Sequence, residues 1–156
     1  MCRVAFAPLL LLAPAAGCGG PAPDYASLEL AEVSGEVTLD GQPLPNAVVR
    51  FYDAGGRTRY AYGRTDADGR YDLQFNTQQS GVRPGEKDVF ISTAATGFEV
   101  KNGGGKERLP ARYNATTELH RTVEKGGSHT FNFDLESAGE IVQPTIVDDE
   151  GEVTED

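Results

Sequence analysis

Tryptophan is missing from this chain, methionine occurs once, and only two cysteines are present among 156 residues. Both cysteines, Cys2 and Cys18, lie near the N-terminus, and no apolar run reaches the roughly 20 residues that a membrane-spanning helix needs. A cysteine-based metal cluster is therefore excluded, and so is a disulfide in any chain that has lost Cys2. The core of a folded domain must be built from Val, Leu, Ile, Phe and Tyr side chains.

The first 20 residues have the pattern of a secretory signal. Arg3 is the only charged residue there, an apolar run extends from Val4 to Leu12, and small residues lead up to Cys18. The stretch AAGC resembles the bacterial lipobox, in which the cysteine is acylated and becomes the mature N-terminus. We therefore expect residues 1–17 to be a lipoprotein signal peptide; the alternative is ordinary cleavage nearby, which would leave a free thiol.

The lipobox resemblance implies a partner and a location. It implies diacylglyceryl and N-acyl chains (palmitate among the usual acyl groups) on Cys18. At about 0.8 kcal/mol for each buried methylene, several such chains anchor a protein stably to a membrane. We therefore expect an extracytoplasmic, membrane-anchored lipoprotein, on the periplasmic side or at the cell surface.

Two segments differ in composition from the middle of the chain. Residues 18–32 are rich in Gly, Pro and small polar residues, which is typical of a flexible tether. Residues 136–156 contain eight acidic residues and no basic ones, so we expect a disordered acidic tail, with a functional acidic arm as the alternative. The whole chain has 24 acidic and 14 basic residues, which leaves a near-neutral body and no reason to expect nucleic-acid binding.

Apolar and polar residues alternate repeatedly over residues 33–135. Val33, Val37 and Leu39, for example, share one face of an extended chain, and similar runs lie at 47–51, 71–75, 89–91, 119–123 and 131–135. Turn-forming stretches such as DGQPLP, DAGGR, RPGEK and EKGGS separate these runs. About seven short strands without a helical period predict one all-β domain over residues 33–135, a seven-stranded immunoglobulin-like β-sandwich.

The acidic stretch from Asp66 to Gly69 has the composition of either a calcium loop or a tight turn. An EF-hand loop with Gly69 as its invariant glycine would place Arg64 and Phe75 at ligand positions, and neither can coordinate calcium. An Asp at the start of a turn bonds the backbone two residues on, and Gly tolerates a positive φ. We therefore predict a hairpin turn in which Asp66, Asp68 and Gly69 are structural, and no metal.

Three stretches are similar to a known family. VSGEVTLDGQPLPNAVVRFYDAGG, GRTDADGRYDL and RPGEKDVFIS resemble the carboxypeptidase regulatory-like domain, a transthyretin-like seven-stranded sandwich that also occurs in small bacterial lipoproteins. The resemblance covers nearly all of residues 33–135, and it implies a fold rather than a function. Lys87 stands where the family has an aromatic residue, so we expect that sheet edge to be rearranged and Phe90 to be exposed.

Known enzymes and adhesins of this fold differ from the chain at their functional residues. Hydroxyisourate hydrolases are expected to end in Tyr-Arg-Gly-Ser whereas this chain ends in EVTED, and the Tyr and His spacing of intradiol dioxygenases is absent. The strand patterns point His120 outward and His129 inward, so the two cannot share a metal or a proton relay. Isopeptide-forming adhesins have Asn in the last strand, as Asn132 is here, but no Lys precedes Lys87 in this chain. We therefore expect no enzyme, no catalytic residue and no cofactor.

Binding or scaffolding at the cell envelope is the remaining expectation. Four aromatic residues could present their rings to the faces of sugars, or could simply be half-buried strand residues: Tyr52, Tyr60, Tyr62 and Phe90. Exposed, coplanar tyrosines would favour a polysaccharide partner, through a carbohydrate-binding module. An apolar patch around Phe90 or an open edge strand would favour an envelope protein as the partner.

The connection over residues 97–117 is longer than an ordinary hairpin loop. It is either a recognition loop or a crossover packed down by Leu109 and Tyr113. The sequence leaves both alternatives open.

Overall fold

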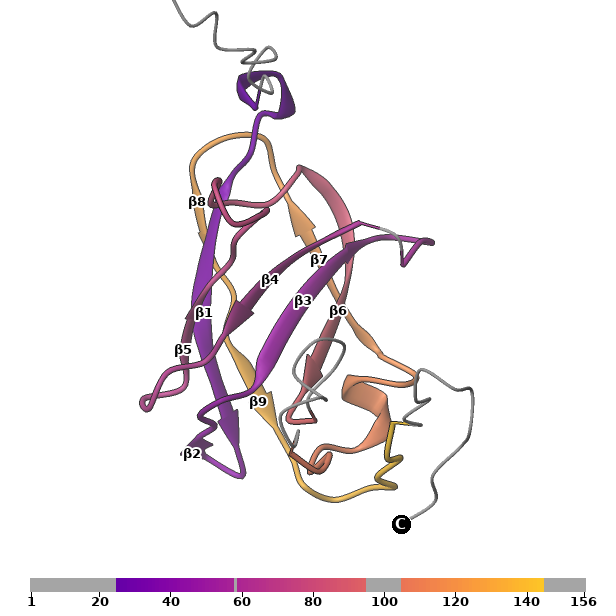
Figure 1. The fold of residues 1–156 in the computed structure, drawn as a ribbon. Helices are drawn as coiled ribbons and strands as arrows, with labels where there is room; N and C mark the ends of the chain where they lie inside the picture. Colours follow the sequence, from indigo (N-terminus) through magenta and orange to yellow (C-terminus); the bar gives the residue numbers. More distant parts are fainter. Residues whose placement is uncertain (1–24, 58, 95–104, 145–156) are drawn as a thin grey trace, which may run out of the picture.

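The computed structural model of the chain describes residues 25–57, 59–94 and 105–144. Cys18, the signal peptide, residues 19–24 of the expected tether and residues 145–156 lie outside these ranges, so the predictions for them remain predictions. The prediction of a flexible tether is wrong for residues 25–32, because Ala26–Leu28 form a 3-10 helix, Ala31 is buried and bridges Val82, and the first strand begins at Glu32. Within the described residues the protein is an all-β sandwich of two sheets (Figure 1). None of the helices in this part of the chain has the length and apolar character needed to cross a membrane.

One sheet has four strands in the order β4-β3-β6-β7, all antiparallel. Its strands are β3 (Val48–Asp53), β4 (Tyr60–Arg64), β6 (Gly85–Ser92) and β7 (Leu119–Val123).

The other sheet has five strands arranged around β1 (Glu32–Leu39). Its remaining strands are β2 (Gln42–Pro43) and β5 (Arg70–Asp72), antiparallel to β1, and β8 (Ser128–Thr130) and β9 (Phe133–Leu135), parallel to it. Two short 3-10 helices, η1 (Ala26–Leu28) and η3 (Ala111–Tyr113), lie outside the sheets.

The described residues contain nine strands where the sequence predicts seven. The strand β2 has only two residues, and β8 and β9 are two parts of one expected strand that keep the same register along β1. Between these parts the side-chain oxygen of Asn132 accepts the hydrogen bond from the Glu36 N–H at 3.0 Å. A side chain thus replaces a main-chain partner there, which interrupts the ladder without changing its direction.

Most inward positions that the alternation predicts lie in the core between the sheets, whereas Leu39, Phe75, Leu119 and Phe131 are only partly buried. The buried side chains include Val33, Val37, Val49, Phe51, Tyr71, Leu73, Val89, Ile91, Phe133 and Leu135. The ring of Phe51 meets that of Phe133 edge-on, with centroids 6.3 Å apart, so the central aromatic residues of the two sheets touch. The expected core composition is confirmed.

The turn from Asp66 to Arg70 joins the two sheets. One oxygen of the Asp66 carboxylate accepts the N–H groups of Asp68 and Arg70, both at 2.9 Å. Gly69 has φ +78, and a Cβ there would lie 2.5 Å from the carbonyl oxygen of Val37. Side-chain bonding and positive φ are the features expected of a turn, and Asp66 supplies the carboxylate that closes it.

The expected hairpin differs in one respect, because β4 and β5 belong to different sheets. A single antiparallel bridge joins the two arms beyond the turn: the N–H of Tyr62 donates to Gln74 O at 2.9 Å, and the N–H of Gln74 donates to Tyr62 O at 2.8 Å. This bridge joins the two sheets at one side of the sandwich, while β4 belongs to the four-stranded sheet and β5 to the five-stranded sheet (Figure 1).

The expectations for Lys87 and Phe90 are wrong. Lys87 lies in β6, an interior strand that pairs regularly with β3 and β7. Its side chain is 2% exposed and its ammonium group is paired with the carboxylate of Asp53. A buried cation requires such a partner, and the pair lets Lys87 occupy an inward position without rearranging the sheet. Phe90, on the outward side of β6, is half-buried rather than exposed.

The described part of the long connection packs down as a crossover. Leu109 and Tyr113 are buried, and the carboxylate of Glu107 is held by several donors, including Ser92 Oγ at 2.5 Å and the N–H of Leu109 at 3.0 Å. Burial alone would raise the pKa of Glu107, but the hydrogen bonds from Ser92, Leu109 and Thr93 outweigh it and hold that pKa below its usual value. Residues 105–117 therefore form a packed crossover rather than a recognition loop. Residues 97–104 lie outside the described ranges.

The prediction of a disordered acidic tail over residues 136–156 is wrong for residues 136–144. These residues are exposed, but they are tied to the crossover by hydrogen bonds. The side chain of Gln143 makes two bonds of 2.9 Å with the backbone N–H and C=O of Glu107, and the N–H of Ala111 donates to Glu140 O at 2.8 Å. Main-chain bonding, which charge composition does not predict, fixes this segment.

Candidate functional site

Four aromatic side chains form a continuous row on the outer face of the four-stranded sheet. The ring centroid of Tyr52 lies 4.9 Å from that of Tyr60 and 5.0 Å from that of Phe90, and Tyr60 lies 6.1 Å from Tyr62. Tyr60 is 43% exposed and the other three are half-buried. We call these four residues the aromatic row. The structure therefore brings together the four residues that the sequence suggests as ligand contacts.

The rings of the row are inclined to one another rather than coplanar. The interplanar angles are 41° for Tyr52 and Tyr60, 79° for Tyr52 and Phe90, and 63° for Tyr60 and Tyr62. A single flat stacking platform is therefore not present, and the row is an uneven apolar strip. Burial raises the pKa of the Tyr52 hydroxyl above its usual value.

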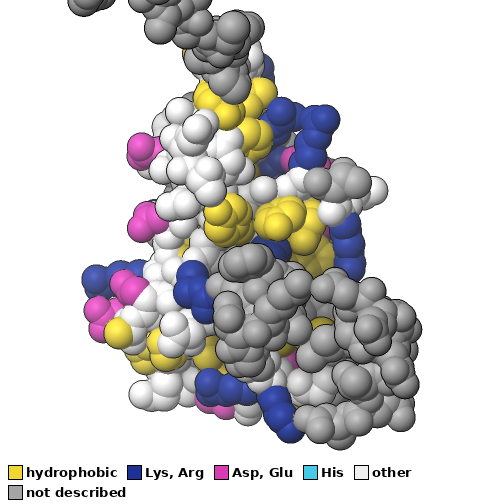
Figure 2. Space-filling model, in the orientation of Figure 1, with side chains coloured by type: hydrophobic (Ala, Val, Ile, Leu, Met, Phe, Trp, Pro, Cys, Tyr) yellow, Lys and Arg dark blue, Asp and Glu magenta, His cyan; other side chains and the backbone are white. Residues whose placement is uncertain are grey.

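Arginine side chains flank the row. The guanidinium carbon of Arg57 lies 4.5 Å from the ring centroid of Phe90, and that of Arg50 lies 5.9 Å from the ring centroid of Tyr60. Both distances are within the range of cation–π contacts. Figure 2 shows hydrophobic side chains in the middle of this face, over β3 and β4, with Lys and Arg side chains around them.

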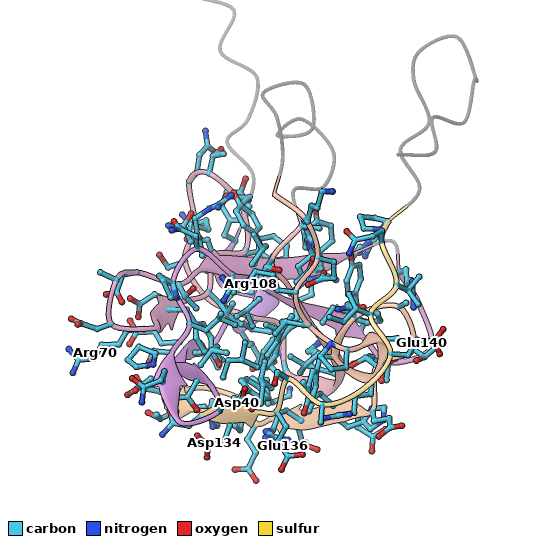
Figure 3. All side chains as sticks on the ribbon, turned by 90° about the horizontal axis from the view of Figure 1, so that it is seen from below. Asp40, Arg70, Arg108, Asp134, Glu136 and Glu140 are labelled. Carbon is cyan, nitrogen blue, oxygen red and sulfur yellow. The ribbon has the colours of Figure 1, made fainter. Side chains whose placement is uncertain are left out.

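A hollow of about 560 Å³ lies beside Tyr60 and Tyr62, where β4 and β5 separate. The side chains lining it come from β3, β4, β5 and the residues that follow: Arg50, Tyr60, Tyr62, Arg64, Asp72 and Gln74. Arg70 lies at its rim, and Figure 3 shows this side chain pointing outward at the periphery of the domain. The hollow is therefore lined by guanidinium groups, phenol rings, an amide and the carboxylates of Asp66 and Asp72.

A glycine allows the two sheets to meet at the base of this hollow. A Cβ at Gly63 would lie 2.5 Å from the main-chain oxygen of Asp72. Any side chain at position 63 would thus push β5 away from β4. The walls of the hollow are held by strands at fixed separation rather than by a free loop.

The two histidines lie on different sheets. His120 is on β7, with Nδ1 2.9 Å from an Asp88 carboxylate oxygen and 67% of its side chain exposed. His129 is on β8, half-buried, with its ring stacked 6.0 Å from that of Phe131. The described ranges contain no group of three or more His, Cys, Asp or Glu side chains placed to hold a metal ion.

The sequence identified the aromatic row but missed the arginines and the hollow. A signal was available in the alternation, because Arg50 and Arg64 occupy the same outward parity as Tyr52, Tyr60 and Tyr62. The hollow forms because β5 pairs with β1 in the five-stranded sheet instead of joining the sheet of β4. Alternation does not predict this long-range pairing.

No family model matches the chain, and no curated protein matches it. Among solved structures, the chain is similar to a DUF3823 family protein from Parabacteroides merdae ATCC 43184, with 15% identity, a TM-score of 0.37, and coverage of 67% of this chain and 45% of that one. It is also similar to a 9R-lipoxygenase from Cyanothece PCC8801, with 14% identity, a TM-score of 0.39, and coverage of 75% of this chain and 18% of that one. The chain thus spans less than half of either protein, and at these TM-scores neither likeness carries an argument about function.

Proposed function

We propose that the protein is a non-catalytic envelope lipoprotein, anchored through Cys18, whose carboxypeptidase regulatory-like sandwich binds or scaffolds a partner through the aromatic row. The observation that carries this proposal is the continuous contact of four aromatic rings on the outward side of a sheet. Isolated apolar residues on a surface are ordinary, whereas a contiguous group of them is typical of an interaction site.

The composition of this face supports an envelope protein as the partner. Tyr, Phe and Arg are enriched in the buried centres of protein interfaces and among their hot-spot residues. Phe90 lies inside an apolar group with Tyr52 and under the guanidinium of Arg57. In addition, β7 is an edge strand of the four-stranded sheet, pairing with β6 alone among the described strands. An apolar patch around Phe90 and an edge strand are the two features expected for a protein partner.

A carbohydrate-binding module is the second candidate. The inclined rings do not provide a flat platform, but Tyr60 and Tyr62 form one side of a hollow that also carries an amide and a carboxylate. Polar groups beside aromatic rings suit the hydroxyl groups and C–H faces of sugars. This candidate uses the Tyr60 end of the row, whereas the first uses the Phe90 end.

Catalysis by Asp88 and His120 has less support than either. His120 is exposed and Asp88 is partly buried on the sheet surface, and the nearby Thr117 hydroxyl donates its proton to the main-chain oxygen of Val89. A general base needs a nucleophile or substrate proton within hydrogen-bond reach.

Capture of partners from envelope extract tests the role of the row. The full-length protein in detergent is compared with Tyr60→Ser and Phe90→Ser, and the captured proteins and glycans are both analysed. Thr38→Val, on the outer face of the other sheet, is the matched control. We expect specific partners to be lost with the row variants and retained with the control. Equal capture by all four proteins would contradict the assignment of the row as the binding surface.

The anchor has a separate test. Cys18→Ser should move the protein from the detergent-soluble membrane fraction to the aqueous fraction, and it should abolish incorporation of labelled acyl chains. A variant that stays with membranes, together with a wild type that takes up no label, would refute lipidation at Cys18.

A further inference from the structure

The hollow beside Tyr60 and Tyr62 carries a chemistry that the aromatic row alone does not. It combines guanidinium groups from three strands with phenol rings, the carboxylates of Asp66 and Asp72, and the amide of Gln74. Its volume of about 560 Å³ lies within the range of small-molecule sites, about 300–1,000 Å³. The ligand should therefore be small or a single unit of a chain, and it should match this mixture of groups.

The charges in the hollow favour an anion. Arg50, Arg64 and Arg70 line it, against the carboxylates of Asp66 and Asp72. One oxygen of Asp66 already accepts two N–H groups of the turn, at 2.9 Å each. Guanidinium groups recognise carboxylates in planar, charge-assisted pairs.

The backbone of the hollow does not supply the usual cradle for a phosphate. Phosphate sites commonly use free main-chain N–H groups. Here the N–H groups of Tyr62, Asp66, Arg70 and Gln74 are all bonded to other atoms of the chain. An anion in this hollow would therefore be recognised by the arginine side chains rather than by the backbone.

The remaining groups favour a sugar ring. Tyr60 is 43% exposed and Tyr62 half-exposed, so ring surface faces the hollow. Asp72 and Gln74 are exposed and supply hydrogen-bond acceptors and a donor for hydroxyl groups. A hexuronic acid has an apolar C–H face, several hydroxyls and one carboxylate, which correspond to the rings, the Asp72–Gln74 pair and the arginines.

We propose that the hollow between β4 and β5 binds a hexuronic acid unit of an acidic polysaccharide, with its carboxylate held by Arg64 and Arg70 and its ring against Tyr60 and Tyr62. This inference rests on the second proposed function, the carbohydrate-binding module, and names a ligand class for the Tyr60 end of the row. Strands β3, β4 and β5 fix the backbone positions of the lining residues. Arg64 donates from Nη1 to the main-chain oxygen of Asn46 at 3.4 Å, and Arg70, which points outward at the rim, must turn toward the hollow to meet the carboxylate.

The test uses the full-length protein in detergent and titration calorimetry with four probes. Oligogalacturonate and oligomannuronate carry the carboxylate on two different sugars, methyl-esterified oligogalacturonate has the same ring without the charge, and polyglutamate has the charge without the sugar. We expect binding to at least one uronate, at least tenfold weaker binding to the methyl ester and to polyglutamate, and weakening by salt.

Substitutions locate the binding. Arg64→Gln and Arg70→Gln should each weaken uronate binding at least tenfold, as should Tyr60→Ser. Arg108→Gln is the matched control, because it removes one positive charge from an exposed arginine that does not line the hollow, and it should leave the affinity unchanged. Melting temperatures of the variants verify that each is folded.

Three results would overturn the inference: equal binding of the ester, equal binding of polyglutamate, or equal loss with Arg108→Gln. Absence of uronate binding would overturn it too. If partner capture from envelope extract still depended on Phe90 and Tyr60 in that case, the proposed function would stand while the ligand class failed.

Discussion

The outer faces of the two sheets use their side chains in opposite ways. On the five-stranded sheet, outward residues bond to each other across strands, as Thr38 does to Asp134 at 2.8 Å and Ser128 to Glu32 at 2.9 Å. On the four-stranded sheet, the outward positions of β3, β4 and β6 carry aromatic rings and arginines. Both sheets bury the same kind of aliphatic and aromatic residues on their inner faces.

This difference separates structural from displayed side chains. Short polar side chains that bond across strands satisfy each other and leave a surface that water covers readily. Large rings on a solvent-facing sheet leave apolar area in contact with water, at a cost of about 25 cal/mol for each Å². A partner that covers the rings would recover that free energy, so the four-stranded face is the one to examine for binding.

The largest expected effect concerns the junction on which both faces depend. Gly69→Val should destabilise the domain by about 2 kcal/mol or more, because a β-branched residue is strained at positive φ and its Cβ would lie 2.5 Å from Val37 O. Thermal and denaturant unfolding of the full-length protein in detergent measure the loss. Both faces should be affected together, since this turn connects their sheets.

Gly41→Val is the control for that substitution. Gly41 has φ +75, close to the φ of Gly69, but a Cβ there would meet nothing within 4 Å. Gly41→Val thus introduces backbone strain without a steric clash, and it should lose clearly less stability than Gly69→Val. Equal losses would mean that the approach of the turn to β1 is unimportant, and that the two sheets are held together elsewhere.

The sequence predicts much of each face because alternation depends on local spacing. The inward side chains, such as Val49 and Phe51, and the outward tyrosines, such as Tyr52 and Tyr60, follow directly from period two. The turn at Asp66 to Gly69 is also local, since one Asp and one Gly determine it. Alternation predicts the side of a strand on which a residue lies.

What the sequence does not predict depends on contacts between distant segments. The burial of Lys87 follows from its pairing with Asp53 on the neighbouring strand, and the attachment of residues 136–144 follows from bonds between Gln143 and the backbone of Glu107. The parallel placement of β8 and β9 beside β1 is similarly remote in sequence. The hollow results from such pairing, so alternation places Arg50 and Arg64 on the outward side of their strands but does not predict the hollow that they line.

The smallest expected effect decides whether the aromatic row is displayed or structural. Tyr60 is 43% exposed, so Tyr60→Ser should cost only about 1 kcal/mol or less of unfolding free energy, chiefly its ring contacts with Tyr52 and Tyr62. Thr38→Val removes one exposed hydrogen bond from the other face and should cost a similarly small amount. Denaturant unfolding of the two variants gives the comparison directly. A loss for Tyr60→Ser of about 3 kcal/mol, as large aromatic truncations in a core produce, would show that the row stabilises the sheet and would remove the reason to treat it as a binding surface.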